Sequence, residues 1–331
     1  MQHIGYRTRS FYLTMSICRI IVFQFLITIG HSTEKCHVSE NRRPLVNSLL
    51  RTLLRSLNVG DSTDPDPTAL LALRLANLHN LTGEKQFQQR LIEAAIRKVK
   101  EGDDFSSGPT ALYTLAFRSA CLDPAKISDG HSQIDLVEHL NSKLKQEIQS
   151  LELNRQPLTD YYQLALAILA LCIEKQPVST YVVEELIVRI MDYGAPFITF
   201  FSIDTASMSV LALSCLHGSP FNKIKRLKIE RPIVRLLQAL LAEQQKDGII
   251  GTIYSTGLAV QALIANQQLD FKIFHCSTSL ERLISEIPKG TFDTLEKISH
   301  VVPALEGHTY LDVQSLHCTS DQDNLPQENE G

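Results

Sequence analysis

Two kinds of hydrophobic pattern alternate along the chain. A short phrase rich in leucine and alanine, apolar on nearly every side of a helix, recurs at residues 69–76, 111–116, 164–171, 206–213 and 255–263, and more weakly at 301–305. Between these phrases lie amphipathic segments with charges on one face, at residues 89–100, 137–151, 182–191 and 231–243. Neighbouring phrases begin about 40–55 residues apart, a spacing typical of repeated helix pairs. Strand patterns are nearly absent, so the sequence predicts an all-α fold.

This alternation has a simple packing explanation. The leucine- and alanine-rich helix of each pair should be buried on most sides, because its small residues let neighbouring helices approach closely. The amphipathic helix then covers it from solvent. Six such pairs can stack as an open solenoid of the HEAT or armadillo type, or close into an α/α barrel with an inner and an outer ring. The spacing alone fits both arrangements.

The N-terminal residues have the pattern of a secretory signal peptide. Three arginines precede an apolar run at residues 20–29, which ends at a Gly-His-Ser sequence suited to cleavage. These ten residues are too few to span a bilayer as a helix. We therefore expect residues 1–32 to be removed and the mature protein to be secreted and extracellular.

Charge and composition limit the classes of partner that the protein can bind. Removal of residues 1–32 deletes three arginines and no acidic residue, which moves the formal net charge from −4 to −7. An acidic chain without a basic stripe binds nucleic acid poorly, and no other segment is long and apolar enough to insert into a membrane. The Asn-Leu-Thr sequon predicts a glycan on Asn80. The polar, acidic residues 319–331 predict a disordered tail.

Six of the seven cysteines remain once Cys18 leaves with the signal peptide. They are Cys36, Cys121, Cys172, Cys215, Cys276 and Cys318. An even number in an oxidising compartment predicts three disulfides, and six cysteines allow 15 connectivities. Zinc binding needs close ligand spacing, whereas no two of these cysteines lie closer than about 40 residues.

The positions of the cysteines favour a closed ring. Cys172 and Cys215 each end a leucine- and alanine-rich phrase, and equivalent positions in adjacent repeats lie side by side, so this pair is the most natural bridge. Cys36 and Cys318 lie near the two ends of the mature chain. Bridges from these ends close very long loops, which suits an α6/α6 barrel better than an open solenoid.

Four distinctive phrases follow one another in order. They read Thr-Asp-Tyr-Tyr-Gln at residues 159–163, Ser-Ile-Asp-Thr at 202–205, Asp-Gly-Ile-Ile-Gly-Thr-Ile-Tyr-Ser-Thr-Gly-Leu-Ala-Val-Gln-Ala-Leu at 247–263 and Pro-Ala-Leu-Glu-Gly-His-Thr-Tyr-Leu-Asp-Val at 303–313. Together they resemble the α-domain of the cobalamin (vitamin B12) transport proteins, the family of intrinsic factor, transcobalamin and haptocorrin, over about residues 36–318.

The resemblance implies a fold, a disulfide pattern and a ligand. It implies an α6/α6 cobalamin-binding domain over residues 33–318 and a secreted protein that carries cobalamin as its ligand rather than using it as a catalytic cofactor. It also implies one of the 15 disulfide patterns. That pattern is Cys36–Cys276, Cys121–Cys318 and Cys172–Cys215.

The resemblance also implies a set of ligand contacts. The corrin ring is a broad disc fringed with primary amides, so its binding surface needs acceptors for amide N–H groups and donors for carbonyl and phosphate oxygens. The positions that match the family's contact segments are Thr159, Tyr162, Gln163, Asp204 and Ser255. None of them is expected to bind the metal directly.

Each of these positions has a simpler explanation. Helix capping or packing in an inner ring would account for them without a ligand. Capping applies to Thr159 with Asp160, to Asp204 and to Ser255, and packing applies to Tyr161 and Tyr162.

The sequence departs from the family at four matched positions. Pro109 replaces a contact glutamine, and Phe201 stands where transcobalamin has a histidine that can bind the upper face of cobalt. Thr252 replaces an asparagine or aspartate. His300 replaces a glutamine before the last phrase, where it could donate to the phosphate or nucleotide or could be a solvated surface residue.

Chain length raises a further expectation. Members of the family continue into a small β-domain that covers the other face of the ligand, whereas this sequence ends 18 residues after Val313. We therefore expect no β-domain and weaker or less selective corrinoid binding, unless a separate partner or dimerisation supplies the cover. A truncated gene model is an alternative explanation. A secreted helical scaffold or receptor-docking protein that has lost ligand binding is the rival function, and a cell-surface receptor is a further expected partner.

Enzymes with α/α barrels are the other alternative. Terpene cyclases need an acid-rich motif, but the acids at residues 64–66 and 103–104 are isolated and suit turns and loops. Prenyltransferases need zinc ligands, whereas the cysteines are assigned to disulfides. We therefore expect the protein not to be an enzyme.

Overall fold

The computed structural model describes residues 36–58, 64–102, 105–192, 201–269 and 274–325. All of these belong to one unit that begins at Cys36. The expected signal peptide at 1–32, the acids at 103–104 and the last residues of the tail lie outside the described residues. Within the described ranges, no helix is long and apolar enough to cross a membrane.

The described residues are mostly helical. Their α-helices are α2 (Arg43–Asn58), α3 (Pro67–Arg74), α4 (Leu81–Glu101), α5 (Ser107–Ser119), α6 (Leu136–Asn154), α7 (Tyr161–Ile173), α8 (Thr180–Asp192), α9 (Ile203–Gly218), α10 (Arg226–Ala242), α11 (Ile253–Ile264), α12 (Cys276–Glu286) and α13 (Leu295–Glu306). Short 3-10 helices are η1 (Glu40–Arg42), η2 (Pro124–Lys126), η4 (Ile287–Lys289), η5 (Tyr310–Ser315) and η6 (Cys318–Ser320). The prediction of a helical fold is thus confirmed.

One small sheet departs from the all-α prediction. Strands β1 (Ile127–Ser128) and β2 (Gln133–Ile134) pair antiparallel, with Ile127 opposite Ile134. The Asp129 carboxylate accepts the backbone N–H groups of the two residues that lead into β2 and so stabilises the turn. Strands of two residues are too short to leave a periodic pattern in the sequence.

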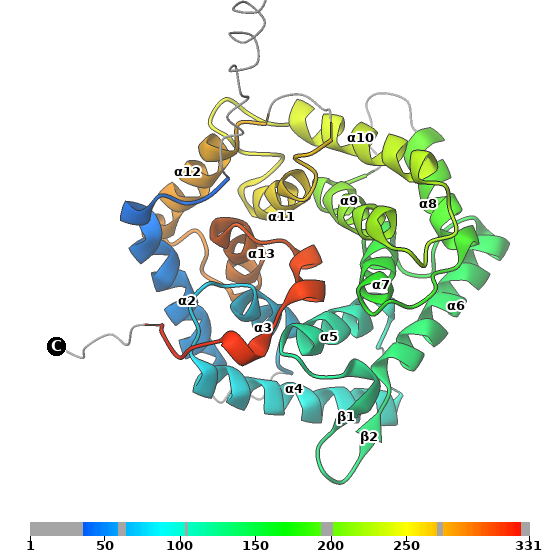
Figure 1. Cartoon of the computed structure of the whole chain (residues 1–331), viewed down its shortest axis with the longest axis horizontal. Helices are drawn as coiled ribbons and strands as arrows, with labels where there is room; N and C mark the ends of the chain where they lie inside the picture. Colours follow the sequence, from blue (N-terminus) through cyan, green and yellow to red (C-terminus); the bar gives the residue numbers. More distant parts are fainter. Residues whose placement is uncertain (1–35, 59–63, 103–104, 193–200, 270–273, 326–331) are drawn as a thin grey trace, which may run out of the picture. The chain divides into compact units, whose positions relative to one another are not determined.

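The odd-numbered helices lie inside and the even-numbered helices lie around them (Figure 1). Each inner helix contacts the next in the order α3, α5, α7, α9, α11 and α13, and α13 contacts α3. The row of inner helices therefore closes on itself. The six leucine- and alanine-rich phrases fall on these inner helices, and the four amphipathic segments fall on α4, α6, α8 and α10.

Small residues allow the inner helices to approach closely. All residues of α7 from Leu164 to Ile173 are buried, which agrees with a helix covered on every side. At Gly257 in α11, a Cβ atom would lie 2.6 Å from the carbonyl oxygen of His300 and 2.9 Å from the Cα of Val301. The backbones of α11 and α13 are therefore nearly in contact at this point.

Three disulfides connect distant parts of the chain. Cys172–Cys215 joins the ends of α7 and α9, with Cα atoms 6.2 Å apart. Cys36–Cys276 joins the start of the described chain to α12, and Cys121–Cys318 joins the second residue after α5 to η6. These are the three pairs that the family resemblance implies.

The C-terminal segment corrects one prediction. Residues 319–325 were expected to be disordered, but Asp321 forms an ion pair with the buried Arg74, and the N–H groups of Asn324 and Leu325 donate to the carbonyl of His79. Arg74 also pairs with the buried Glu84, so Asp321 supplies its second carboxylate, and Leu325 is itself buried. These contacts hold the segment against α3 and α4.

Replacing Gly257 with alanine is expected to lower the free energy of unfolding by about 1–3 kcal/mol, because the added methyl group meets the α13 backbone rather than a movable side chain. Urea unfolding followed by circular dichroism measures this change. Gly218→Ala is the matched control, since nothing lies within 4 Å of a Cβ at that position of α9. Equal losses in the two variants would contradict the close approach of α11 and α13.

Candidate functional site

The predicted ligand contacts gather at the starts of the inner helices. Thr159 precedes α7, Tyr162 and Gln163 lie in its first turn, Asp204 lies in the first turn of α9, and Ser255 lies in the first turn of α11. Three contacts show that the starts of neighbouring inner helices lie side by side. They are Ser106 with Gln163 (α5 to α7), Tyr161 with Phe201 (α7 to α9) and Ser255 with Asp204 (α9 to α11).

A cavity of 470 Å³ lies where α5, α6 and α7 meet, and Thr159 and Gln163 line it. The Ser106 hydroxyl donates to Gln163 Oε1 over 3.1 Å, while Gln163 Nε2 donates to Asp160 over 3.2 Å. Gly108 leaves the space for this side chain, because a Cβ at that position would lie 2.6 Å from Gln163 Cγ. The side chain of Gln163 is therefore held between two helices.

Glu147 is a residue of this cavity that the sequence prediction missed. It is 1% exposed and accepts hydrogen bonds from the hydroxyls of Ser107 (2.6 Å) and Thr159 (2.7 Å) and from the backbone N–H of Thr159 (3.2 Å). The sequence pattern could have identified it, because Glu147 lies three residues after Leu144 and four before Leu151, on the buried stripe of α6. A charged residue on the apolar face of a predicted helix marks a buried polar contact.

Asp204 and Ser255 form a direct link between α9 and α11. Ser255 Oγ donates to Asp204 Oδ2 over 3.1 Å; Ser255 is buried and Asp204 is half-buried. Gly251 assists this approach, because a Cβ there would lie 2.5 Å from the side chain of Ile203. The second carboxylate oxygen of Asp204 has no bond to another described residue, so it is available to a ligand.

The capping explanation holds for Asp160 but is wrong for Asp204 and Ser255. Asp160 caps α7, Ser202 caps α9 by accepting the N–H of Thr205, and Thr252 caps α11 by accepting the N–H of Ser255. Asp204 and Ser255 instead lie inside the first turns and bond to each other. Their side chains therefore link α9 to α11 instead of capping either helix.

The two tyrosines of α7 differ in their surroundings. Tyr161 stacks obliquely on Phe201, with ring centroids 5.6 Å apart, and accepts a hydrogen bond from Arg189, so the packing explanation holds for it. Tyr162 is half-buried, and its burial, followed by the nearby charges of Asp204, Asp160 and Glu296, raises the pKa of its hydroxyl. Tyr162 is therefore a neutral donor close to carboxylates from α9 and α13.

The four positions that depart from the family differ in their burial and in their position relative to the inner helices. Phe201 is buried at 1% exposure, whereas Pro109 is half-buried in the first turn of α5. Thr252 is the N-cap of α11, and its hydroxyl also contacts Ser255 Oγ at 3.0 Å. His300 is half-buried on α13, and its backbone oxygen faces Gly257.

The surface around these residues combines polar and apolar groups. Carboxylates come from Asp160, Asp204 and Glu296, and apolar surface comes from Leu158, which is 61% exposed, and Tyr254, which is 41% exposed. No group of His, Cys, Asp and Glu within the described ranges could hold a metal ion. The arrangement can bind the amide fringe of a broad ligand and can support its apolar ring.

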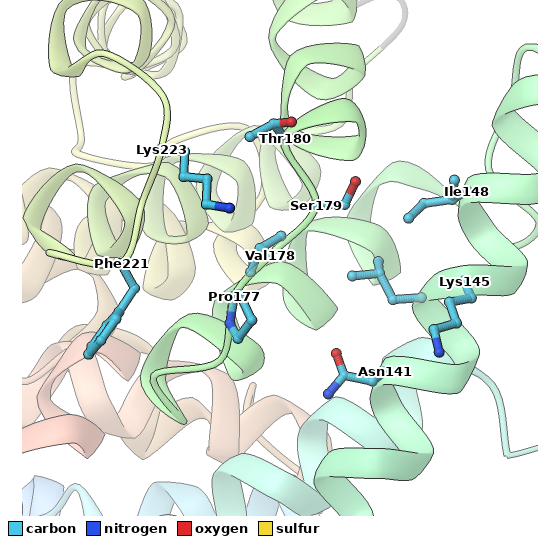
Figure 2. Close-up of a pocket in the computed structure, with 10 residues that line it drawn as sticks. Asn141, Lys145, Ile148, Pro177, Val178, Ser179, Thr180, Phe221 and Lys223 are labelled. Atoms are coloured by element: carbon cyan, nitrogen blue, oxygen red, sulfur yellow. The ribbon is translucent and has the colours of Figure 1, made fainter.

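A second cavity, of 410 Å³, lies away from this group, between α6 and the connections that follow α7 and α9 (Figure 2). Its lining includes Lys145, Phe221 and Lys223 but none of the predicted ligand contacts. The predicted contacts are therefore confined to the starts of the inner helices.

The fold is that of a helical, disulfide-linked protein whose predicted ligand contacts gather at the starts of its inner helices. The model of the eukaryotic cobalamin-binding protein family matches residues 18–331, and the chain belongs to this family. The members of the family are carriers rather than enzymes, so the prediction that the chain is not an enzyme is confirmed.

Individual relatives are moderately similar. The chain is 32% identical over 327 residues to human transcobalamin-1, a match that covers 92% of this chain and 70% of the relative. It is 30% identical over 305 residues to the rat cobalamin binding intrinsic factor, covering 90% of this chain and 67% of the relative. The crystal structure of haptocorrin in complex with Cbi aligns with a TM-score of 0.71 at 30% identity, over 88% of this chain and 74% of that one.

The capping assignments lead to a stability test. Ser202→Ala should lower the free energy of unfolding by about 1 kcal/mol, because it removes the N-cap of α9. Asp204→Asn should cost less than half as much, since its amide oxygen can still accept from Ser255. Thermal or urea unfolding of both variants measures the difference. A larger loss for Asp204→Asn than for Ser202→Ala would restore the capping explanation for Asp204.

Proposed function

We propose that this protein binds cobalamin or a related corrinoid at the starts of α7, α9 and α11, within an α6/α6 barrel, and carries it outside the cell. The observation that carries the proposal is the Asp204–Ser255 hydrogen bond. It joins two first turns and leaves a half-buried carboxylate oxygen available to an amide N–H. The family membership supplies the ligand class.

The chemistry of the group suits a corrinoid. A corrin side arm ends in a primary amide, which offers N–H donors and a carbonyl acceptor. Asp204 would accept from one such amide, and the neutral hydroxyl of Tyr162 can donate to a carbonyl. Leu158 and Tyr254 would support the apolar parts of the ring. The haptocorrin structure with Cbi supports a corrinoid cargo for a chain of similar fold.

We further propose that the protein is secreted after loss of residues 1–32. Three disulfides agree with an oxidising compartment. The expected glycan on Asn80 is compatible with its local role, because Asn80 caps α4 through Oδ1, which accepts from Gly83, while a glycan would attach to Nδ2.

Titration of the purified protein with hydroxocobalamin should shift the absorbance spectrum of the ligand, and the colour should remain with the protein on gel filtration. Asp204→Ala should weaken binding at least tenfold, because it removes the acceptor for an amide and the hydrogen bond from Ser255 to α9. Asp323→Ala, which removes an exposed carboxylate of the C-terminal segment, is the matched control and should bind normally.

Two results would contradict this proposal. Absence of any spectral shift or retained colour would favour the scaffold or receptor-docking function instead. Normal affinity in Asp204→Ala, with binding otherwise intact, would show that the ligand contacts lie elsewhere.

Expression of the full chain in mammalian cells should release a protein whose N-terminus begins after residue 32 and whose mass falls on treatment with an N-glycosidase. Thr82→Ala removes the sequon but keeps Asn80 as the cap of α4, so its mass should not change on the same treatment while its melting temperature stays close to wild type. Intracellular retention, or a glycosidase-sensitive Thr82→Ala protein, would contradict the assignment.

A further inference from the structure

One segment of the surface is strongly basic although the chain as a whole is acidic. Residues 223–231 contain five basic residues and one acid, whereas the chain without residues 1–32 has a formal net charge of −7. All five basic residues are exposed, and we call them the basic surface: Lys223, Lys225, Arg226, Lys228 and Arg231. The expectation, drawn from net charge, that the chain has no basic stripe therefore fails at this segment.

The fold holds the basic surface in a defined conformation. Ile224 and Ile229 are buried, at 8% and 0% exposure, so the residues between them face solvent. The Asn222 side chain accepts the backbone N–H of Ile224 over 3.0 Å and donates to its carbonyl over 3.2 Å, just before α10 begins at Arg226. Three positions apart on that helix, Lys228 and Arg231 share an exposed side. The positive charges are therefore presented by an ordered segment.

Few acidic groups neutralise the basic surface. Glu184 of α8 lies 3.5 Å from Lys228 Nζ, but both side chains are more than half exposed, so this ion pair is weak. The acid of the segment, Glu230, lies 3.9 Å from His217 instead. The other four basic residues form no ion pair with another residue that the structure describes. Most of the positive charge is therefore available to a partner.

An ordinary solvated helix face is the simpler explanation for exposed charges. Such a face usually carries both signs interspersed, and α4, α6 and α8 follow this pattern, because acidic and basic residues alternate along each of them. The basic surface differs from these outer helices in having nearly one sign. A surface of one sign attracts ligands of the opposite charge.

The basic surface continues into the cavity of Figure 2. Lys223 and Lys145 of α6 lie on opposite sides of this cavity, and no acidic residue lines it. Its uncharged polar lining comes from Asn141, Ser179 and Thr180. Phe221, which is 55% exposed, adds an aromatic face. A group that fits here has negative charge, hydroxyl groups and an apolar ring face, a combination found in a charged sugar.

We propose that the basic surface binds a linear sulfated polysaccharide of the glycosaminoglycan class, and that the cavity between Lys145 and Lys223 binds one of its charged sugars. Repeated sulfate and carboxylate groups complement a row of lysines and arginines through charge-assisted hydrogen bonds. This proposal goes beyond the proposed corrinoid binding. It rests on the proposed function only for secretion, since these polysaccharides are extracellular.

An anionic membrane is the competing partner. Phe221 and Leu227, which are 55% and 70% exposed, place apolar side chains beside the cations, as membrane-surface segments do. However, the negative surface potential of a cell membrane belongs to its cytoplasmic leaflet. A secreted protein meets the opposite leaflet, so an extracellular polysaccharide fits the basic surface better.

The basic surface lies beyond the opposite end of α9 from the candidate site. Asp204 lies in the first turn of α9, and this helix of 16 residues ends at Gly218, about 24 Å away. The basic surface follows that end, on the connection to α10 and on the first turns of α10. A polysaccharide bound there leaves the starts of the inner helices open to another ligand.

Heparin is the probe for this proposal, and hyaluronan, which has carboxylates but no sulfate, is its control. The purified protein should bind immobilised heparin with an affinity that falls as the NaCl concentration rises, and should bind hyaluronan at least about tenfold more weakly. A triple variant, Lys225→Gln with Arg226→Gln and Lys228→Gln, should bind heparin at least about tenfold more weakly and with a smaller salt dependence. Surface plasmon resonance at several salt concentrations measures both changes.

Two further variants test the cavity and the role of overall charge. Lys145→Gln with Lys223→Gln should weaken heparin binding by about three- to tenfold, because both lysines face the cavity. The matched control removes three exposed lysines from other parts of the surface, Lys85→Gln, Lys126→Gln and Lys246→Gln, and should change the affinity by less than about twofold. Each variant should keep the wild-type melting temperature, since all of these side chains are exposed.

Several results would overturn the proposal. They are absence of heparin binding, equal weakening by the triple variant and the matched control, and equal affinity for hyaluronan and heparin. Stronger binding to phosphatidylserine vesicles than to heparin would assign the basic surface to a membrane instead. An unchanged affinity in the double variant would contradict the role of the cavity.

A hydroxocobalamin titration separates this proposal from the proposed function. The triple variant should bind the corrinoid as the wild-type protein does, because the basic surface lies away from the candidate site. Failure of the wild-type protein to bind any corrinoid would overturn the proposed function and leave the heparin result to decide this proposal. Loss of corrinoid binding in the triple variant alone would contradict the separation of the two surfaces.

Discussion

The close approach of the inner-helix backbones is the constraint on which the rest of the structure depends. At Gly257 the space between α11 and α13 is too small for a single methyl group. Small residues at such contacts let the helix backbones approach closely, and the inner helices form a closed row in which each contacts both neighbours. Closure then brings the first turns of consecutive helices together. The contacts of Gln163 with Ser106 and of Ser255 with Asp204 follow from that proximity.

Helix capping frees the site residues for their cross-helix contacts. The start of a helix leaves backbone N–H groups without partners, and a side chain must usually satisfy them. Asp160, Ser202 and Thr252 take that role at α7, α9 and α11. Other side chains of the first turns, among them Asp204 and Ser255, are then free to bond between helices. Each cap therefore satisfies the helix start, while the contact residue beside it bonds across to the neighbouring helix.

The sequence predicts the inner helices well because their periodic burial is a local property. The six apolar phrases fall on six inner helices, and the first-turn positions of Asp204 and Ser255 follow from the phrases around them. Contacts between residues far apart in the chain are harder to predict, because they produce no periodic pattern in the sequence. Asp321 lies in a polar segment whose composition predicts disorder, and its partner, the buried Arg74, lies 247 residues earlier in the chain. Glu147 was missed because the resemblance directs attention to the inner helices, whereas this carboxylate comes from an outer one.

The segment that follows α13 also packs against the inner helices that carry the candidate site. After α13, the segment η5 contacts α5, α7 and α9, and its Tyr310 is almost completely buried. Burial, followed by the nearby hydroxyl of Tyr162, raises the pKa of Tyr310, so this side chain lies close to a predicted ligand contact. The backbone N–H of Tyr310 donates to Gln261 of α11 over 3.2 Å, which fixes the start of the segment. The Cys121–Cys318 disulfide holds the residues that follow η5, so a bridge far from α7 in sequence helps to fix the segment that packs against α7. The closed row of inner helices, the disulfides and the packing of η5 therefore act together to position the candidate site.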